Sequence, residues 1–183
     1  MMKINATDSQ VLVVDIQQKL APHLTHVASM VENATRVLKG ALLFNVPITI
    51  AEQYPKGLGH SVDELKPFIN DNVITKESFS CFGEAAIVSK LKQYQLQGKS
   101  TLIVLGCEAH VCVLQTVLDA LAANFNVIVV SDAVSSRKAS DIDLAKTRLE
   151  KCGVTYVSTE MLLFEWTQTK NNPHFKEISR LVK

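Results

Sequence analysis

Three residues whose side chains can do chemistry together each follow an apolar stretch of the sequence. They are Asp15, Lys76 and Cys112. A thiol beside a carboxylate and an ammonium group can act as a nucleophile, because the carboxylate accepts the thiol proton and the ammonium stabilises the anion that forms. The combination therefore indicates covalent catalysis through a cysteine.

The surroundings of Cys112 favour that chemistry. The apolar run 101–105 ends at Gly106, and residues 109–123 carry a helical pattern of apolar side chains. Cys112 is thereby predicted in the first turn of a helix, where main-chain N–H groups and the helix dipole favour a thiolate. N–H groups around the Gly106 turn would suit the oxyanion of a tetrahedral intermediate.

Taken singly, each of the other two residues has a simpler interpretation. Asp15 follows a continuous apolar run and would serve as a helix cap or a solvent-facing strand end, while Lys76 is of a type that usually lies on the surface. A buried ionised carboxylate is costly unless it is paired. Because the carboxyl ends of parallel strands line one edge of a sheet, we expect Asp15, Lys76 and Cys112 to converge there.

The rest of the chain supplies the elements that must position these residues. Short β-branched runs alternate with amphipathic stretches, which predicts an α/β fold with a mostly parallel sheet flanked by helices. We predict six strands at 11–16, 48–51, 72–77, 101–105, 127–132 and 154–157, and helices at 27–44, 84–95, 109–123, 141–151 and 159–166. The whole chain, 1–183, is predicted to form one domain, with 170–183 as a C-terminal helical tail.

Composition excludes several classes of function. The net charge is +1 and no Lys/Arg run is dense enough for a nucleic-acid footprint, so we expect no nucleic-acid partner. No apolar stretch is long enough for a membrane span, so we expect no membrane partner. The N-terminus lacks the apolar segment of a signal peptide, and the four cysteines show no metal-type pair. A cytoplasmic protein with free thiols is the expectation, and the nucleotide-binding glycine fingerprints are absent.

The same residues resemble the isochorismatase-like cysteine hydrolases, and the similarity covers nearly the whole chain. The motifs that carry it are Asp15-Ile16-Gln17, Lys76-Glu77-Ser78-Phe79-Ser80-Cys81, Gly106 followed by Cys112-Val113, and Ser131-Asp132-Ala133. The stretch 52–59 and Glu108-Ala109-His110 look most similar to the isochorismatase domain-containing subgroup of that family.

The resemblance implies a Rossmann-like six-stranded sheet with helices on both faces, assembled as a homo-oligomer (dimer, tetramer or larger). It implies Cys112 as nucleophile, Asp15 as general base and acid, and Lys76 as electrostatic support. It also implies a cis peptide bond between Cys107 and Glu108, which would turn the N–H groups of Glu108 and Cys112 toward an oxyanion.

Two departures from the family bear on activity. Nicotinamidases of the family hold a metal through an Asp-x-His motif after the second strand, where this chain has Glu52-Gln53-Tyr54 and only His60 nearby. We therefore predict no catalytic metal and no cofactor. Ala109 stands where the family often has Thr, which leaves open whether the usual activity is kept. His110 is interpreted as a surface or interface residue and not as a catalytic base.

These observations together predict a cysteine hydrolase of a small amide or related carbonyl-type substrate. The residues expected to contact that small-molecule substrate are Gln17, Gln53, Tyr54, Phe79 and Phe82, although Gln17 would equally serve as a cap and Phe82 as a core residue. Two alternatives stay open. The fold could serve as a non-catalytic interaction or scaffold module, or Cys112 could be a redox sensor resolved by Cys107 or Cys81.

Overall fold

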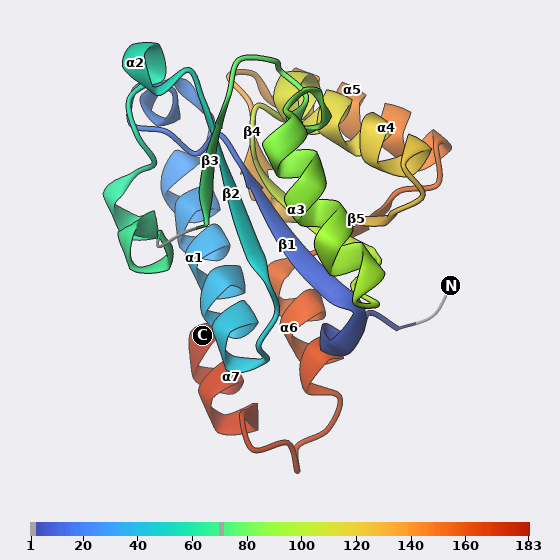
Figure 1. The fold of residues 1–183 in the computed structure, drawn as a ribbon. Helices are drawn as coiled ribbons and strands as arrows, with labels where there is room; N and C mark the ends of the chain where they lie inside the picture. Colours follow the sequence, from blue (N-terminus) through green and yellow to red (C-terminus); the bar gives the residue numbers. More distant parts are fainter. Residues whose placement is uncertain (1–2, 70–71) are drawn as a thin grey trace.

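The computed structural model describes residues 3–69 and 72–183, and its centre is one parallel sheet (Figure 1). The strands run in the spatial order β3-β2-β1-β4-β5-β6, and every pair is parallel. Their bounds are β1 Ser9–Val14, β2 Ile48–Gln53, β3 Val73–Lys76, β4 Thr101–Cys107, β5 Asn126–Ser135 and β6 Thr155–Val157. The strand order reverses beside β1, and in open α/β sheets that switch point is where ligands bind.

Helices cover both faces of the sheet, as predicted (Figure 1). Helices α1 (Val27–Leu43), α6 (Thr159–Thr167) and α7 (Phe175–Leu181) pack on one face, and α3 (Ala85–Leu96), α4 (Leu114–Ala122) and α5 (Ala139–Lys151) pack on the other. Shorter turns connect them: α2 Pro55–Leu58, η1 Ala6–Asp8, η2 Ala21–His23, η3 Asp63–Phe68, η4 Cys81–Gly83 and the π-helical η5 Ala109–Val113.

The two faces explain why the strands are continuously apolar. Along β1, Val11 and Val13 belong to the core beneath α1 and α6, whereas Leu12 and Val14 belong to the core beneath α3 and α4. Both sets are fully buried. A strand covered on both sides has no solvated face, so the alternation of an exposed strand disappears.

Three local features differ from the predicted elements. The helix that carries Cys112 begins with a π turn, in which the Val113 N–H donates to the Glu108 carbonyl over 3.2 Å, and becomes α-helical only at Leu114. Strand β5 continues to Ser135, beyond its predicted end at Asp132. The connection between β2 and β3 contains α2 and η3, which the prolines in that stretch obscured.

Gly106 brings the end of β4 against β1. Its φ is +121°, and a Cβ at this position would collide with the main chain of Val14. Only glycine tolerates both the conformation and the contact. The turn before Cys112 therefore lies directly beside the end of β1, where Asp15 stands.

Candidate active site

Asp15 is the first polar residue after β1, and it is completely buried. Its backbone has φ +51°, a left-handed conformation that Asp adopts more readily than most residues. The Asp15 N–H donates to the Ala51 carbonyl over 3.1 Å, and the Asp15 carbonyl accepts from the Cys107 thiol over 2.9 Å. A solvent-facing strand end is therefore wrong for Asp15, since its side chain has no contact with water.

Lys76 is the last residue of β3 and is only 1% exposed, so the surface interpretation of this lysine is wrong. Its Nζ donates to Asp15 Oδ2 and to Gln53 Oε1, each over 2.7 Å. It also donates to the main-chain oxygens of Ser78 and Phe79, over 3.1 and 3.0 Å. The ammonium group thus reaches from β3 across β2 to the end of β1 and pairs with the buried carboxylate.

Lys76 binds only one of the two carboxylate oxygens of Asp15. Within the described part of the chain, buried Asp15 Oδ1 has no hydrogen-bond partner that meets ordinary geometry. Burial raises the pKa of Asp15 above its usual value, and the charge and hydrogen bond of Lys76 oppose that shift without cancelling it. Asp15 is consequently a carboxylate with a raised affinity for a proton and an oxygen available to receive one.

Cys112 lies in the π turn after β4 and is 7% exposed. Burial raises the pKa of its thiol, the negative charge of Asp15 raises it further, and Lys76 lowers it. Burial is the largest of these effects, and it opposes the thiolate that the position at the helix start favours. The thiol interacts electrostatically with both Asp15 and Lys76, so the structure brings the three residues together.

The turn between β4 and the π turn has the cis peptide bond that the resemblance implies, between Cys107 and Glu108. The Glu108 side chain points to the loop after β5, where Oε2 accepts from the Arg137 N–H over 3.1 Å and from Arg137 Nε over 3.0 Å. His110 Nδ1 lies 2.9 Å from Ser136 Oγ in the same loop. Glu108 and His110 thus attach the turn to the β5 loop.

The five residues predicted to contact substrate do not share one role. Tyr54 and Phe79 are 47% and 56% exposed, so their side chains are free to meet a ligand. Phe82 packs edge-on against Phe125 in the core beneath α3 and α4. Gln17 is fully buried and binds main-chain groups of Gln53 and Gly59, and the Gln53 side chain binds Lys76.

A second buried carboxylate, Glu52, was missed by the sequence reasoning. It is 2% exposed, and Oε1 accepts from the Ser61 N–H over 2.6 Å and from Ser61 Oγ over 2.7 Å. Oε2 lies 3.0 Å from His60 Nδ1. Burial raises the pKa of Glu52, but the hydrogen bonds from Ser61 and His60 together outweigh it and leave the pKa lowered. An acidic residue directly after the apolar run 48–51 was the available signal.

Among the described residues, no group of three His, Cys, Asp or Glu side chains is arranged to hold a metal ion. The absence of a catalytic metal stays a prediction. The four cysteines are free thiols; Cys81, Cys107 and Cys112 are buried and Cys152 is exposed.

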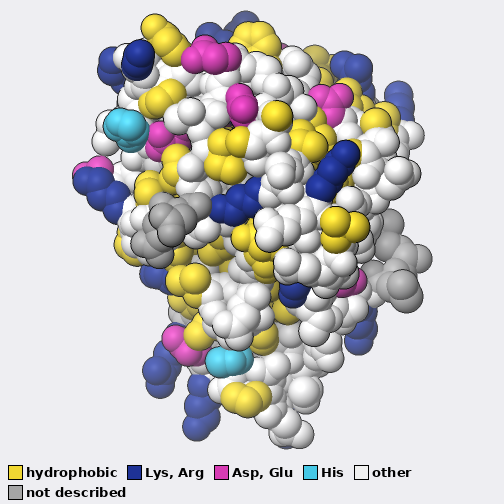
Figure 2. Space-filling model, in the orientation of Figure 1, with side chains coloured by type: hydrophobic (Ala, Val, Ile, Leu, Met, Phe, Trp, Pro, Cys, Tyr) yellow, Lys and Arg dark blue, Asp and Glu magenta, His cyan; other side chains and the backbone are white. Residues whose placement is uncertain are grey.

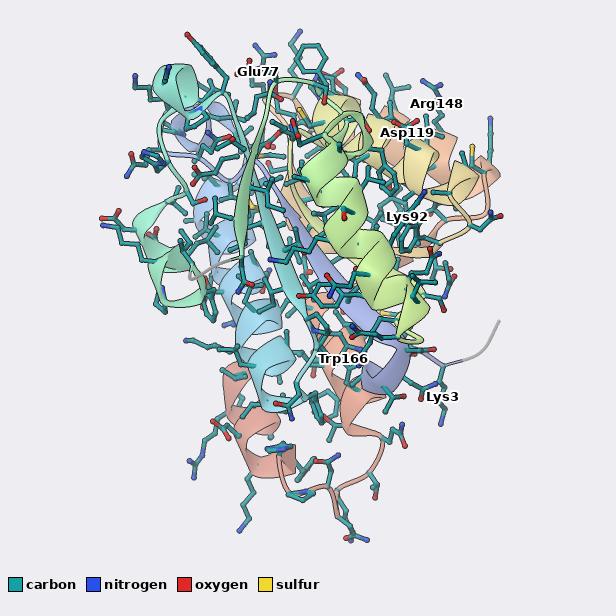
Figure 3. All side chains as sticks on the ribbon, in the orientation of Figure 1. Lys3, Glu77, Lys92, Asp119, Arg148 and Trp166 are labelled. Carbon is teal, nitrogen blue, oxygen red and sulfur yellow. The ribbon has the colours of Figure 1, made fainter. Side chains whose placement is uncertain are left out.

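The site lies at one end of the sheet. In Figure 3, Glu77, which directly follows Lys76, marks that end, and Trp166 lies toward the other. Trp166 Nε1 donates to Ser9 Oγ at the start of β1, which confirms that it belongs to the opposite edge. Asp119 on α4 accepts from Ser80 Oγ over 2.6 Å and ties the loop after β3 to the helix that follows Cys112.

The isochorismatase domain model matches residues 9–161, and the chain belongs to the isochorismatase family. It is 34% identical over 172 residues to "Isochorismatase domain-containing protein 1" of Salmo salar, a match that covers 92% of this chain and 59% of that protein. The chain thus spans about three fifths of the length of that relative, whose match also supports the predicted subgroup.

Solved structures support the same assignment. The structure described as the MAR1 ribonuclease of Caenorhabditis elegans superposes with a TM-score of 0.90 at 34% identity, covering 99% of this chain and 92% of that one. The YcaC protein of Escherichia coli, described as an octameric hydrolase of unknown specificity, has a TM-score of 0.89 over 100% of this chain and 95% of that one. Its 23% identity shows a shared fold only. In the described part of this chain, no helix is long and apolar enough to span a membrane.

Proposed function

We propose that this protein is a cysteine hydrolase that cleaves a small amide or a related carbonyl-type bond, with Cys112 as nucleophile, Asp15 as general base and acid, and Lys76 as electrostatic support. One observation carries the proposal. Lys76 binds Oδ2 of Asp15, whereas Oδ1 has no partner of ordinary hydrogen-bond geometry among the described residues, and the buried Cys112 thiol interacts with this same carboxylate. A structural ion pair has no need of such an unpaired oxygen, which costs stability.

The proposed reaction starts from the neutral thiol. Asp15 takes the proton from Cys112 Sγ as sulfur forms a bond to the substrate carbonyl carbon, and the main-chain N–H groups of Glu108 and Cys112 hold the resulting oxyanion. Collapse of the intermediate breaks the C–N bond, and the amine leaves with the proton from Asp15. Water then attacks the thioester while Asp15 accepts its proton, and release of the acid returns the proton to Cys112.

A small substrate fits the closed surroundings of the thiol. Asp15, Lys76 and Cys112 are all buried or nearly so, which leaves little room for a polymer backbone. The C. elegans relative is described as a ribonuclease. On the face seen in Figure 2, Lys and Arg side chains are scattered among acidic and apolar ones and form no basic patch for RNA. We therefore propose a small-molecule substrate and no nucleic-acid partner, in a cytoplasmic homo-oligomer like the octameric E. coli relative.

The decisive measurement is the pH dependence of iodoacetamide alkylation, resolved by mass spectrometry for each cysteine. If Asp15 takes the Cys112 proton, the thiolate fraction rises with ionisation of Asp15 and then levels off, since proton transfer within the pair does not depend on pH. We expect a rate that rises at acid pH and is flat through neutral pH. A small free thiol such as glutathione is the control, and its rate should climb tenfold per pH unit up to about pH 8.5, the pKa of an ordinary thiol.

A Cys112 rate that climbs like that of the free control thiol, with no plateau, contradicts the proposal and favours a scaffold role. An oxidant-induced mass loss of two hydrogen atoms, shared by Cys112 and either Cys107 or Cys81, shows a disulfide and favours the redox sensor. Where the plateau is present, a screen of small amides and esters follows, with RNA included and Cys112→Ala as the inactive control. Cleavage of RNA alone would overturn the small-substrate assignment. Light scattering during chromatography tests the homo-oligomer.

A further inference from the structure

Gln53 ends β2 directly beside Lys76. The register of the two strands pairs these residues, and the Gln53 side chain bridges the end of β3. Its Oε1 accepts from Lys76 Nζ over 2.7 Å, while its Nε2 donates to the Glu77 carbonyl over 2.6 Å. Both ends of the amide are therefore hydrogen-bonded to the strand that carries the lysine and to the residue after it.

Gln53 is itself held from the side of β1. Gln17 Oε1 accepts from the Gln53 N–H over 2.8 Å, and Gln17 Nε2 donates to the carbonyls of Gln53 and Gly59 over 3.0 and 2.6 Å. Gln17 is fully buried, so these bonds are shielded from water. The two glutamines thus form a continuous chain of hydrogen bonds from the segment after β1, across β2, to the ammonium group of Lys76.

We propose that Gln53 is a positioning residue for Lys76, which it orients toward Asp15, and that it does not contact the substrate. The inference rests on the proposed hydrolase function. An ammonium group has three N–H donors, and the loop carbonyls of Ser78 and Phe79 attract Lys76 Nζ toward β3. Gln53 stands at the end of β2, the strand between β3 and β1, and its Oε1 supplies a third neutral acceptor. Lys76 Nζ therefore has four acceptor oxygens for three N–H donors, so at least one hydrogen bond is shared, and the two shortest, at 2.7 Å, go to Gln53 Oε1 and Asp15 Oδ2.

Loss of Gln53 Oε1 has a specific chemical consequence. A Lys76 ammonium that moves toward the loop carbonyls stabilises the Asp15 carboxylate less, so Asp15 would hold its proton to higher pH. The proposed base would then be ionised over a narrower pH range. A residue that only bound substrate would leave the ionisation of Asp15 unchanged.

The test is the same alkylation profile in Gln53→Met, which keeps the length of the side chain and removes both hydrogen bonds. We expect the acid limb of the Cys112 profile to move up by about one pH unit, because a hydrogen bond to a charged group contributes roughly that much. At a pH on the limb the rate should fall about tenfold. The plateau rate should change by less than about threefold, because Lys76 stabilises the Cys112 thiolate as well as the Asp15 carboxylate and the two losses offset each other in the proton transfer. Gln93→Met, at an exposed position on α3, is the matched control and should leave the profile unchanged.

Lys76→Met separates this inference from the proposed function. If the alkylation rate of wild-type Cys112 shows no rise at acid pH followed by a plateau, the proposed hydrolase function is wrong. If Lys76→Met shifts the acid limb of the Cys112 alkylation profile and Gln53→Met does not, the proposed hydrolase function is retained and the proposed role of Gln53 is wrong. Gln53→Asn, one methylene too short to reach Lys76 Nζ, should reproduce the shift. Circular dichroism must show native folding, and if both Gln53 variants unfold, Gln53 supports the fold as a whole and the proposal is wrong.

Discussion

Two buried carboxylates at the ends of neighbouring strands have opposite properties. Asp15 follows β1 and Glu52 lies near the end of β2, and both are almost inaccessible to water. Both oxygens of Glu52 have hydrogen-bond partners, and its pKa is lowered. Asp15 has one oxygen paired with Lys76 and one without a partner among the described residues, and burial leaves its pKa raised.

The comparison shows that burial alone does not determine whether the pKa of a carboxyl group is raised or lowered. Removal from water raises the pKa of both groups. It outweighs the charge and hydrogen bond of Lys76 at Asp15, whereas the hydrogen bonds of Ser61 and His60 outweigh it at Glu52. Glu52 uses its charge to hold the segment at Ser61, which also pairs with Gln17 in an isolated β-bridge. Asp15 Oδ1 has no hydrogen-bond partner of ordinary geometry among the described residues, so it is available to accept the Cys112 proton. We infer that Glu52 stabilises the segment at Ser61 beside the site and that Asp15 is the carboxylate that acts in catalysis.

The largest expected effect separates the two carboxylates directly. Asp15→Asn removes the proposed base, so it should abolish the pH plateau of the Cys112 alkylation rate and lower the rate of hydrolysis of any substrate found by about 10²–10⁴-fold. Glu52→Gln should change both rates by less than about threefold, because the Glu52 carboxylate binds Ser61 and His60 and not Asp15, Lys76 or Cys112. Parallel rate measurements on the two variants decide the matter, and equal losses in both would contradict the division of roles.

Lys76→Met should cause the largest loss of stability. It leaves Asp15 as an unpaired buried charge, which costs about 3–5 kcal/mol in the free energy of unfolding. Because the pKa of folded Asp15 lies above its usual value, ionisation of Asp15 opposes folding. The deficit should therefore shrink as pH falls through that raised pKa and the carboxyl becomes neutral. Urea unfolding between pH 4 and 8 measures it.

The double variant Asp15→Asn/Lys76→Met is the control for that experiment. It removes both charges, so it should lose less stability than Lys76→Met at neutral pH and show no matching dependence on pH. A Lys76→Met deficit that stays constant from pH 4 to 8 would mean that Asp15 is not the group left unpaired.

Most of the fold and the identity of the three central residues could be predicted from the sequence. Alternating apolar runs and helical patterns depend on local spacing, so six parallel strands and their flanking helices could be identified. Asp15, Lys76 and Cys112 each follow such a run, and the shared edge of the sheet explains why they meet. What they do in catalysis stays a proposal.

The environment of those residues could not be predicted, because it depends on contacts across strands. Lys76 stands two strands from Asp15, at about 4.8 Å per strand, so its burial follows from the strand order and from the length of its side chain. Gln53 meets Lys76 only through the register of β2 and β3. The raised pKa of Cys112 depends on how completely the surrounding turns exclude water. None of these is a local property of the sequence.

Glu52→Gln should have a smaller effect on stability, with the opposite dependence on pH. Because the pKa of folded Glu52 lies below its ordinary value of 4.5, its ionised form stabilises the fold above that pH, and the contribution is lost as pH falls through the lower folded value. We expect a loss of about 1–3 kcal/mol at neutral pH. In urea unfolding, the gap to the wild type should narrow below about pH 4.5, whereas a gap that widens on acidification would contradict the role of Glu52.

His60→Ala should have the smallest effect, and it tests which partner holds Glu52. The His60 side chain is 78% exposed, so its contact with Glu52 is exchanged for water at little cost, and we expect less than about 1 kcal/mol. Ser61→Ala removes a buried hydroxyl donor 2.7 Å from the same carboxylate and should cost more, about 1–2 kcal/mol. Salt at 1 M should reduce any His60 contribution and leave that of Ser61 unchanged, since screening acts on exposed charges. A larger loss for His60→Ala than for Ser61→Ala would show that the exposed imidazole, and not the buried loop segment, keeps Glu52 ionised.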